Sequence, residues 1–271
     1  MTDTRHSILR SVAEDLERVD GVPDTPQTLS PAYRLAFDDS EFLRSDDLRP
    51  VRLQLELQKF EMILNAMEID TTIVMFGGSR ILSPGKRLQA RTPYLAELTK
   101  YYDEARQFAR LAGTECMKRG GREYVVTTGG GPGVMEAGNR GAQEVGAPSI
   151  GLNIVLPHEQ APNEYVTPAL SFNFHYFAIR KMHFLMRARA IAVFPGGYGT
   201  LDELFETLTL IQTDRMERVP VILFGSEFWN RIVNWQALSE AGTISPEDLD
   251  LFRMVDCANE GWDMIRAAEG L

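Results

Sequence analysis

The chain has 271 residues, 44% of them apolar and 24% charged, and a formal net charge of −10. This acidic composition argues against non-specific binding of nucleic acid. The two cysteines, Cys116 and Cys257, are too few for a disulfide framework and too far apart for a zinc knuckle. Residues 1–6 lead into no apolar run, and no stretch suits a bilayer. We therefore expect no signal peptide, no membrane partner and a cytoplasmic location.

Residues 1–70 differ in composition from the rest of the chain. They are rich in charge and proline, and Gly21 is their only glycine. Residues 11–19 and 50–67 are expected to be helices, and the second carries an apolar stripe at roughly helical spacing: Leu53, Leu57, Phe60 and Leu64. We interpret the region as an N-terminal helical extension, which either packs on the main domain or forms a partly mobile arm.

Residues 71–271 alternate between short apolar runs and longer helical segments. The runs, several of them β-branched, are expected to be strands: 71–76, 124–128, 149–155, 190–194 and 219–224, with a weaker one at 170–174. The expected helices are 94–119, 133–145, 175–189, 201–213, 229–238 and 248–268. This alternation predicts an α/β domain with a Rossmann-like, doubly wound, mostly parallel sheet and helices on both faces.

Glycine-rich turns follow three of the predicted strands: Gly77-Gly78-Ser79-Arg80, Gly129-Gly130-Gly131-Pro132-Gly133 and Pro195-Gly196-Gly197-Tyr198-Gly199-Thr200. Ligands bind at the carboxyl edge of open parallel sheets. Glycine lets backbone N–H groups approach an anion, and a following helix adds unpaired N–H groups and the positive end of its dipole. These turns therefore predict a phosphate site, with residues 195–200 as its main part.

The alternative is that these glycines only permit tight turns, which is less convincing for three turns at one edge than for one. Neither a GxGxxG nor a GxxxxGK[ST] pattern occurs, so the sequence supports neither the dinucleotide fingerprint nor the Walker-type loop.

Glu203 follows the last turn and has two interpretations. Thr200 and Glu203 have the spacing of a capping box, in which the two side chains bond the backbone at the helix start. The other interpretation is a carboxylate held beside the ligand for acid–base or ion-stabilising work. Spacing alone favours the capping box.

The segment 175–189 is aromatic, apolar and basic at once. Arg180, His183 and Arg187 have the spacing of one helical face, which suggests an anionic ligand or simply a solvated basic face. His183 is expected to serve packing. Since no group of histidines and acids has metal-ligand spacing, we expect no metal.

The pair Arg180-Lys181 and the segment 195–203 resemble the LOG (Lonely Guy) family, whose signature is PGGxGTxxE preceded by an Arg-Lys pair. Residues 129–137 and 76–80 resemble the family's other turns, so the resemblance covers roughly 71–225. It implies that Arg180 and Glu203 are catalytic. It also implies a substrate-binding set of Gly196, Gly197, Gly199, Thr200, Gly130, Gly131, Gly133, Met135, Ser79 and Arg80.

The resemblance further implies a Rossmann-like fold and a homodimer or higher homo-oligomer. It implies cleavage of the N-glycosidic bond of AMP or a cytokinin riboside 5'-monophosphate, without a cofactor. Two departures leave the preferred base open: the N-terminal extension, and residues 187–190 in place of the Ser-Asp-Ala that short members carry.

Two alternatives to a hydrolase remain. One is a non-catalytic nucleotide sensor or carrier on the same fold. The other is the lysine decarboxylase of older descriptions, which needs a cofactor-linked lysine, and Lys181 is the only lysine near a motif.

Overall fold

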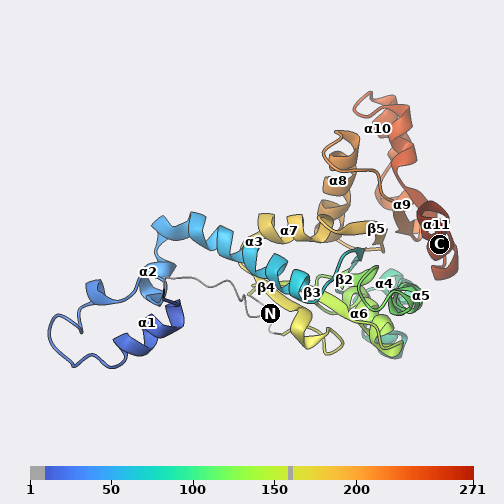
Figure 1. Ribbon diagram of the computed structural model, residues 1–271. Helices are drawn as coiled ribbons and strands as arrows, with labels where there is room; N and C mark the ends of the chain where they lie inside the picture. The colour runs from blue at the N-terminus through green and yellow to red at the C-terminus, as the bar shows by residue number, and fades with distance from the viewer. Residues whose placement is uncertain (1–9, 158–160) are drawn as a thin grey trace. The chain divides into compact units, whose positions relative to one another are not determined.

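The computed structural model describes residues 10–157 and 161–271 (Figure 1). The chain divides into two compact units, Met1–Lys59 and Phe60–Leu271. No helix of the described residues has the length and apolar character that crossing a membrane requires.

The first unit consists of short helices. In chain order they are α1 (Val12–Val19), η1 (Pro31–Tyr33), α2 (Ser40–Arg44), η2 (Asp46–Leu48) and the first part of α3 (Arg49–Ala66). Ser11 and Glu14 form a capping box at the start of α1, and the Asp39 carboxylate accepts two N–H groups at the start of α2. The helices expected over 11–19 and 50–67 are therefore present, and α3 continues into the second unit.

The second unit contains a seven-stranded parallel sheet in the order β4-β3-β2-β1-β5-β6-β7. The strands are β1 (Thr72–Phe76), β2 (Val125–Thr128), β3 (Ser149–Ile154), β4 (Ser171–Phe174), β5 (Ala188–Val193), β6 (Val221–Phe224) and β7 (Arg253–Val255). The predicted α/β, Rossmann-like fold is confirmed. Strand order reverses at the neighbouring pair β1 and β5, which is the switch point where ligands bind in this architecture.

Helices cover the sheet on both sides. They are η3 (Pro84–Gln89), α4 (Pro93–Glu97), α5 (Lys100–Lys118), α6 (Val134–Glu144), η4 (Pro168–Leu170), α7 (Phe177–Leu185), α8 (Tyr198–Gln212), α9 (Ser226–Ile232), α10 (Trp235–Glu240), η5 (Pro246–Leu251) and α11 (Ala258–Glu269). In Figure 1, α5 and α6 lie together on one side of the strands, and α7 and α8 lie on the other.

The core joins the sheet to these helices through aromatic contacts. The Phe194 and Phe224 rings stack with centroids 4.2 Å apart, and the Phe108 ring meets the Phe224 ring edge-on at 5.3 Å. All five residues of β1 are buried. This packing holds the strand ends, and therefore the glycine-rich turns, in fixed positions.

Several predicted helix limits are wrong. The predicted helix 175–189 ends at Leu185, because residues from Ala188 onward form β5. The predicted helix 248–268 contains β7, a three-residue edge strand in which only Val255 is buried. Segments 94–119 and 229–238 are each two helices rather than one.

Candidate active site

A cavity of about 950 Å³ opens at the carboxyl ends of β1 and β5, within the range of about 300–1,000 Å³ usual for small-molecule sites. The first and third glycine-rich turns line it over 77–81 and 195–203, whereas the second turn contributes only Gly129. Side chains of α4, α7 and α9 complete the wall with Tyr94, Leu95, Leu98, Phe177, Arg180, Phe184, Phe228 and Ile232. The cavity therefore lies at the predicted edge of the sheet.

The third turn leads into α8 with unpaired backbone donors. The N-cap is Gly197, and no side chain caps the helix. The first N–H bonded within this turn is that of Leu201, which donates to the Gly197 carbonyl at 3.0 Å. The N–H groups of residues 198–200 precede that bond, so the start of α8 has the donors and the dipole of an anion site.

Close contact between the first and third turns requires glycine at position 196. A Cβ there would lie 2.1 Å from Thr200 Oγ1 and 3.0 Å from the Gly78 nitrogen. The Gly78 N–H in turn donates to the Pro195 carbonyl at 2.9 Å. The two turns thus form one continuous backbone surface at the switch point.

The capping-box interpretation of Glu203 is wrong. The helix begins at Tyr198, so Thr200 is its third residue rather than its N-cap. A glycine at the true N-cap carries no side-chain signal, so the sequence could not show that the helix begins before Thr200. Glu203 is therefore available for another role.

Glu203 is a buried acid in the cavity wall. The residue is 9% exposed and lines the cavity, and the neighbouring side chains act on its carboxyl group through their charges. Burial raises the pKa of Glu203 to about 7; Lys181 and Arg180 oppose the rise, while Glu206 and Asp202 add to it. A carboxyl group that titrates near neutral pH suits general acid–base catalysis.

Arg180 is held by a carbonyl of β3 and by an aromatic ring of its own helix. Its Nε donates to the Leu152 carbonyl of β3 at 2.6 Å, and its guanidinium lies 5.0 Å from the centroid of the Phe184 ring. A Cβ at Gly129 would lie 2.8 Å from Arg180 Nη2 and 2.7 Å from Met135 Sδ. Glycine at 129 therefore makes room for both side chains beside the cavity.

The other glycines of the second turn take part in hydrogen bonds and close backbone contacts that shape the turn itself. The Gly130 N–H donates to Thr128 Oγ1 at 3.0 Å, and the Asn163 side-chain amide donates to the carbonyls of Gly130 and Gly131, both at 3.0 Å. A Cβ at Gly133 would lie 2.4 Å from the Gly78 carbonyl oxygen.

Three of the predicted binding residues, namely Gly130, Gly131 and Gly133, consequently lie outside the cavity wall, and their role in substrate binding stays a prediction. The other predicted residues line the cavity: Arg180, Glu203, Gly196, Gly197, Gly199, Thr200, Met135, Ser79 and Arg80.

The predicted cationic face of 175–189 is wrong for two of its three members. His183 is 2% exposed, and its ring packs at a tilt against the Phe60 ring with centroids 4.1 Å apart, which confirms the expectation that it serves packing. Arg187 lies beyond the end of α7 and donates to Glu61 and to Asn65, each at 2.7 Å. Only Arg180 of this set reaches the cavity.

Sequence reasoning missed the residues that α4 and α9 contribute to the cavity, such as Tyr94 and Ile232. They are apolar or aromatic and lie far apart in the chain, so no local pattern distinguishes them from core residues. Gly129 was part of a recognised turn, but which glycine of that turn reaches the cavity depends on Arg180 and Met135.

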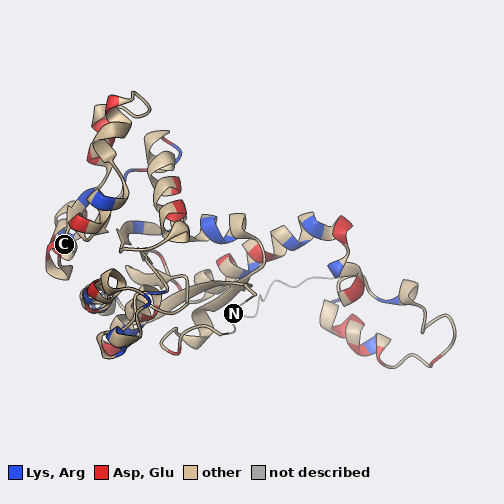
Figure 2. Cartoon of the chain, turned by 180° about the vertical axis from the view of Figure 1, so that it is seen from behind, with Lys and Arg blue, Asp and Glu red and all other residues tan. Residues whose placement is uncertain are grey.

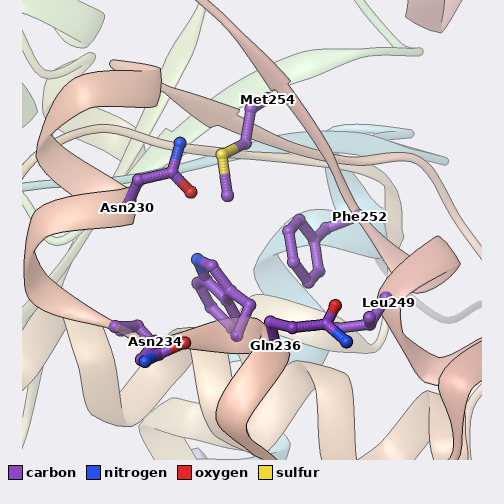
Figure 3. Close-up of a pocket in the computed structure, with 8 residues that line it drawn as sticks. Asn230, Asn234, Gln236, Leu249, Phe252 and Met254 are labelled. Carbon is purple, nitrogen blue, oxygen red and sulfur yellow. The ribbon is translucent and has the colours of Figure 1, made fainter. Parts of the chain in front are cut away.

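A second pocket, of about 360 Å³, lies between α9, α10, η5 and β7 (Figure 3). Asn230, Phe252 and Met254 project into it, and none of its lining residues is titratable. It shares no lining residue with the larger cavity. This smaller pocket therefore offers no acid or base for catalysis. Over residues 10–157 and 161–271, no group of three or more His, Cys, Asp or Glu side chains could hold a metal.

The fold and the site define an α/β protein with glycine-rich turns at the switch point of a parallel sheet. Residues 135–265 match a family described as "Possible lysine decarboxylase". The LOG family formerly carried that description, so the match confirms the resemblance of this chain to that family. The match includes α7 and the third turn, whereas the first two turns precede it.

Some solved structures are similar to this chain at low identity. A molybdenum cofactor binding protein from Rippkaea orientalis is 18% identical, over 74% of this chain and 98% of its own, with a TM-score of 0.47. A molybdenum cofactor carrier protein from Chlamydomonas reinhardtii is 15% identical, over 74% and 99%, with a TM-score of 0.46. Among curated proteins no sequence matches. At these identities and scores the likeness says nothing about what this chain binds.

Proposed function

We propose that the protein hydrolyses the N-glycosidic bond of a purine nucleoside 5'-monophosphate, either AMP or an N6-substituted AMP. The products are the free base and ribose 5-phosphate. The observation that carries the proposal is one cavity with two features: a helix start with unpaired N–H groups, and a buried carboxyl group of raised pKa, Glu203. The resemblance to a family that includes cytokinin-activating phosphoribohydrolases supports it.

The start of α8 is the proposed phosphate site. The N–H groups of residues 197–200 and the helix dipole favour a dianion there, and the Thr200 hydroxyl adds a donor. Glu203 follows Thr200 by three residues, about 4.5 Å of helix rise. Because helical side chains lean towards the N-terminus, Glu203 is directed back to the same end of α8. A phosphate bound there places the attached ribose beside Glu203.

Glu203 then supplies the negative charge that the reaction needs. When the bond from C1′ to the base breaks, its electron pair leaves with the base, and positive charge develops on the sugar. The Glu203 carboxylate stabilises that charge and takes a proton from the water whose oxygen bonds to C1′; that proton is then passed to the departing base, which restores the carboxylate. Binding energy from the remote phosphate thus raises the rate at the sugar.

The base is proposed to occupy the part of the cavity between α4 and α9. Tyr94, Leu95, Leu98, Phe228 and Ile232 line that part, and they suit an aromatic ring with or without an apolar substituent. Arg180 also lines the cavity, bonded to the Leu152 carbonyl of β3, and is proposed either to orient Glu203 or to assist departure of the base.

A lysine decarboxylase is a poor fit to this cavity. All five lysines belong to the described part of the chain, and none of them lines the cavity. Lys181 is the one nearest to the motif, and its ammonium bonds to Asp202 and Glu206, which keeps it protonated rather than free to form a Schiff base.

The test is a release assay with purified protein and a panel of nucleoside 5'-monophosphates, the corresponding nucleosides and lysine. We expect free base from a purine monophosphate, little from its nucleoside and no product from lysine. Glu203→Gln should bind AMP but turn over ~100- to 10,000-fold more slowly. AMP binding by the wild-type protein without release of base would instead identify a sensor or carrier, and absence of binding would contradict both.

A further inference from the structure

Lys181 joins two helices that carry the candidate catalytic residues. It lies on α7 directly after Arg180, and its side chain is 16% exposed. Its Nζ is 3.0 Å from Asp202 Oδ2 and 2.7 Å from Glu206 Oε2, both on α8. Since Asp202 and Glu206 are four residues apart, they lie on one side of α8. One ammonium group therefore connects α7 to two successive turns of α8.

The lysine end of this bridge is largely buried, whereas Asp202 lies at the cavity wall with its side chain 61% exposed. Figure 2 shows basic residues on α7 and acidic residues along α8. Consecutive helical residues point about 100° apart, so Arg180 reaches β3 and the second turn while Lys181 reaches α8. Glu203 lies on α8 between Asp202 and Glu206, the two acids that Lys181 holds.

We propose that Lys181 is a positioning residue of this site, which holds α8 against α7 so that Glu203 and Arg180 face the same cavity. The importance of Lys181 for catalysis rests on the proposed function. The effect of Lys181 on the Glu203 carboxyl group does not depend on that function and can be measured without turnover.

Four charged side chains act on the Glu203 carboxyl group: Arg180 and Lys181 from α7, and Asp202 and Glu206 from α8 itself. Burial raises the pKa of Glu203, and among the charges Lys181 opposes the rise most. Burial alone would lower the pKa of Lys181, but its bonds to Glu206 and Asp202 raise it, so the ammonium stays charged at neutral pH. Removing that charge while the acids remain leaves Glu203 harder to ionise.

An ordinary ion pair on a helix surface contributes little and would not change the titration of Glu203. Lys118 provides that comparison within the same chain. Its Nζ lies 3.0 Å from Glu115 on α5, its side chain is 67% exposed, and it does not line the cavity. Lys118→Met is therefore the matched control for Lys181→Met, and Lys181→Arg restores the positive charge.

The experiment is a titration of the full chain labelled with carbon-13 at glutamate carboxyl groups, followed by NMR. The Glu203 signal is assigned by its absence in Glu203→Gln. In Lys181→Met we expect a higher titration midpoint, so that the ionised fraction of Glu203 at pH 6 falls ~3- to 10-fold. Lys181→Arg and Lys118→Met should keep the wild-type midpoint. If Lys181→Met does not fold, Lys181→Gln replaces it with the same expectation.

An unchanged midpoint in a folded Lys181→Met protein would overturn the proposal, as would an equal change in Lys118→Met or in Lys181→Arg. With AMP as substrate, we also expect Lys181→Met to lower kcat more than it changes KM, and Lys181→Arg to recover kcat. If the wild-type protein hydrolyses no nucleoside monophosphate, the proposed function fails while the NMR titration still decides the role of Lys181.

Discussion

The buried acid Glu203 should make the protein less stable at neutral pH than its glutamine variant. Burial raises the pKa of this carboxyl group from 4.5 to about 7. Between these pH values the unfolded chain has lost the proton that the folded chain still holds, so unfolding becomes easier as pH rises. Below about pH 4.5 both states are protonated, and the effect disappears.

The difference of pKa sets the size of the effect. A rise from 4.5 to about 7 corresponds to a loss of up to about 3 kcal/mol in the free energy of unfolding above pH 7. Glu203→Gln has no ionisable group there and escapes this loss. We therefore expect the variant to be more stable than the wild type at pH 8, by up to roughly 6–12 °C in Tm, and about equally stable at pH 4.

The assay is thermal and urea unfolding of both proteins from pH 4 to pH 8. Glu115→Gln is the control of opposite sign, because hydrogen bonds from Lys118 and Arg119 lower the pKa of Glu115 despite its partial burial. That variant should lose stability above pH 5 rather than gain it. If Glu203→Gln changes stability equally at pH 4 and pH 8, or lowers it at pH 8, Glu203 is not a buried carboxyl group of raised pKa.

Three further predictions concern activity and binding. The value of kcat/KM for AMP should fall about tenfold per pH unit below the pKa of Glu203, about 7, since the ionised carboxylate is required; a flat profile from pH 5 to pH 8 would contradict this role. Thr200→Ala should raise KM for AMP ~10- to 100-fold, because a hydrogen bond to the charged phosphate is lost. An unchanged KM would mean that the phosphate does not bind at Thr200. Gly196→Ala should abolish AMP binding in calorimetry, because its Cβ would lie 2.1 Å from Thr200 Oγ1; normal affinity would refute the close contact of the turns.

The positions of the sheet edge and of the proposed phosphate-binding turn could be predicted from the sequence, because both depend on local patterns. Apolar runs followed by glycines predicted where β1, β2 and β5 end, and parallel strands bring such ends together. The short edge strand β7 was not predictable in this way, since only one of its three residues is buried. The start of α8 was also missed, because its N-cap is Gly197 rather than a residue with a capping side chain.

The details of the site depend on contacts between distant parts of the chain. The carbonyls of Gly130 and Gly131 accept hydrogen bonds from Asn163, more than 30 residues later in sequence. The ion pairs of Lys181 with α8 likewise cross 21 or more residues. The spacing of residues within one segment carries no information on such distant pairs. It could therefore predict that the second turn lies at the site, but not which of its glycines reaches the cavity.

The central claim is that a nucleoside 5'-monophosphate binds with its phosphate at the start of α8 and its glycosidic bond beside residue 203. A crystal structure of Glu203→Gln with AMP tests it most directly. We expect phosphate oxygens within hydrogen-bonding distance of the N–H groups of residues 197–200, and C1′ in contact with the side chain at position 203. A phosphate bound instead at the exposed arginines of the cavity rim, Arg80 and Arg91, would contradict the account.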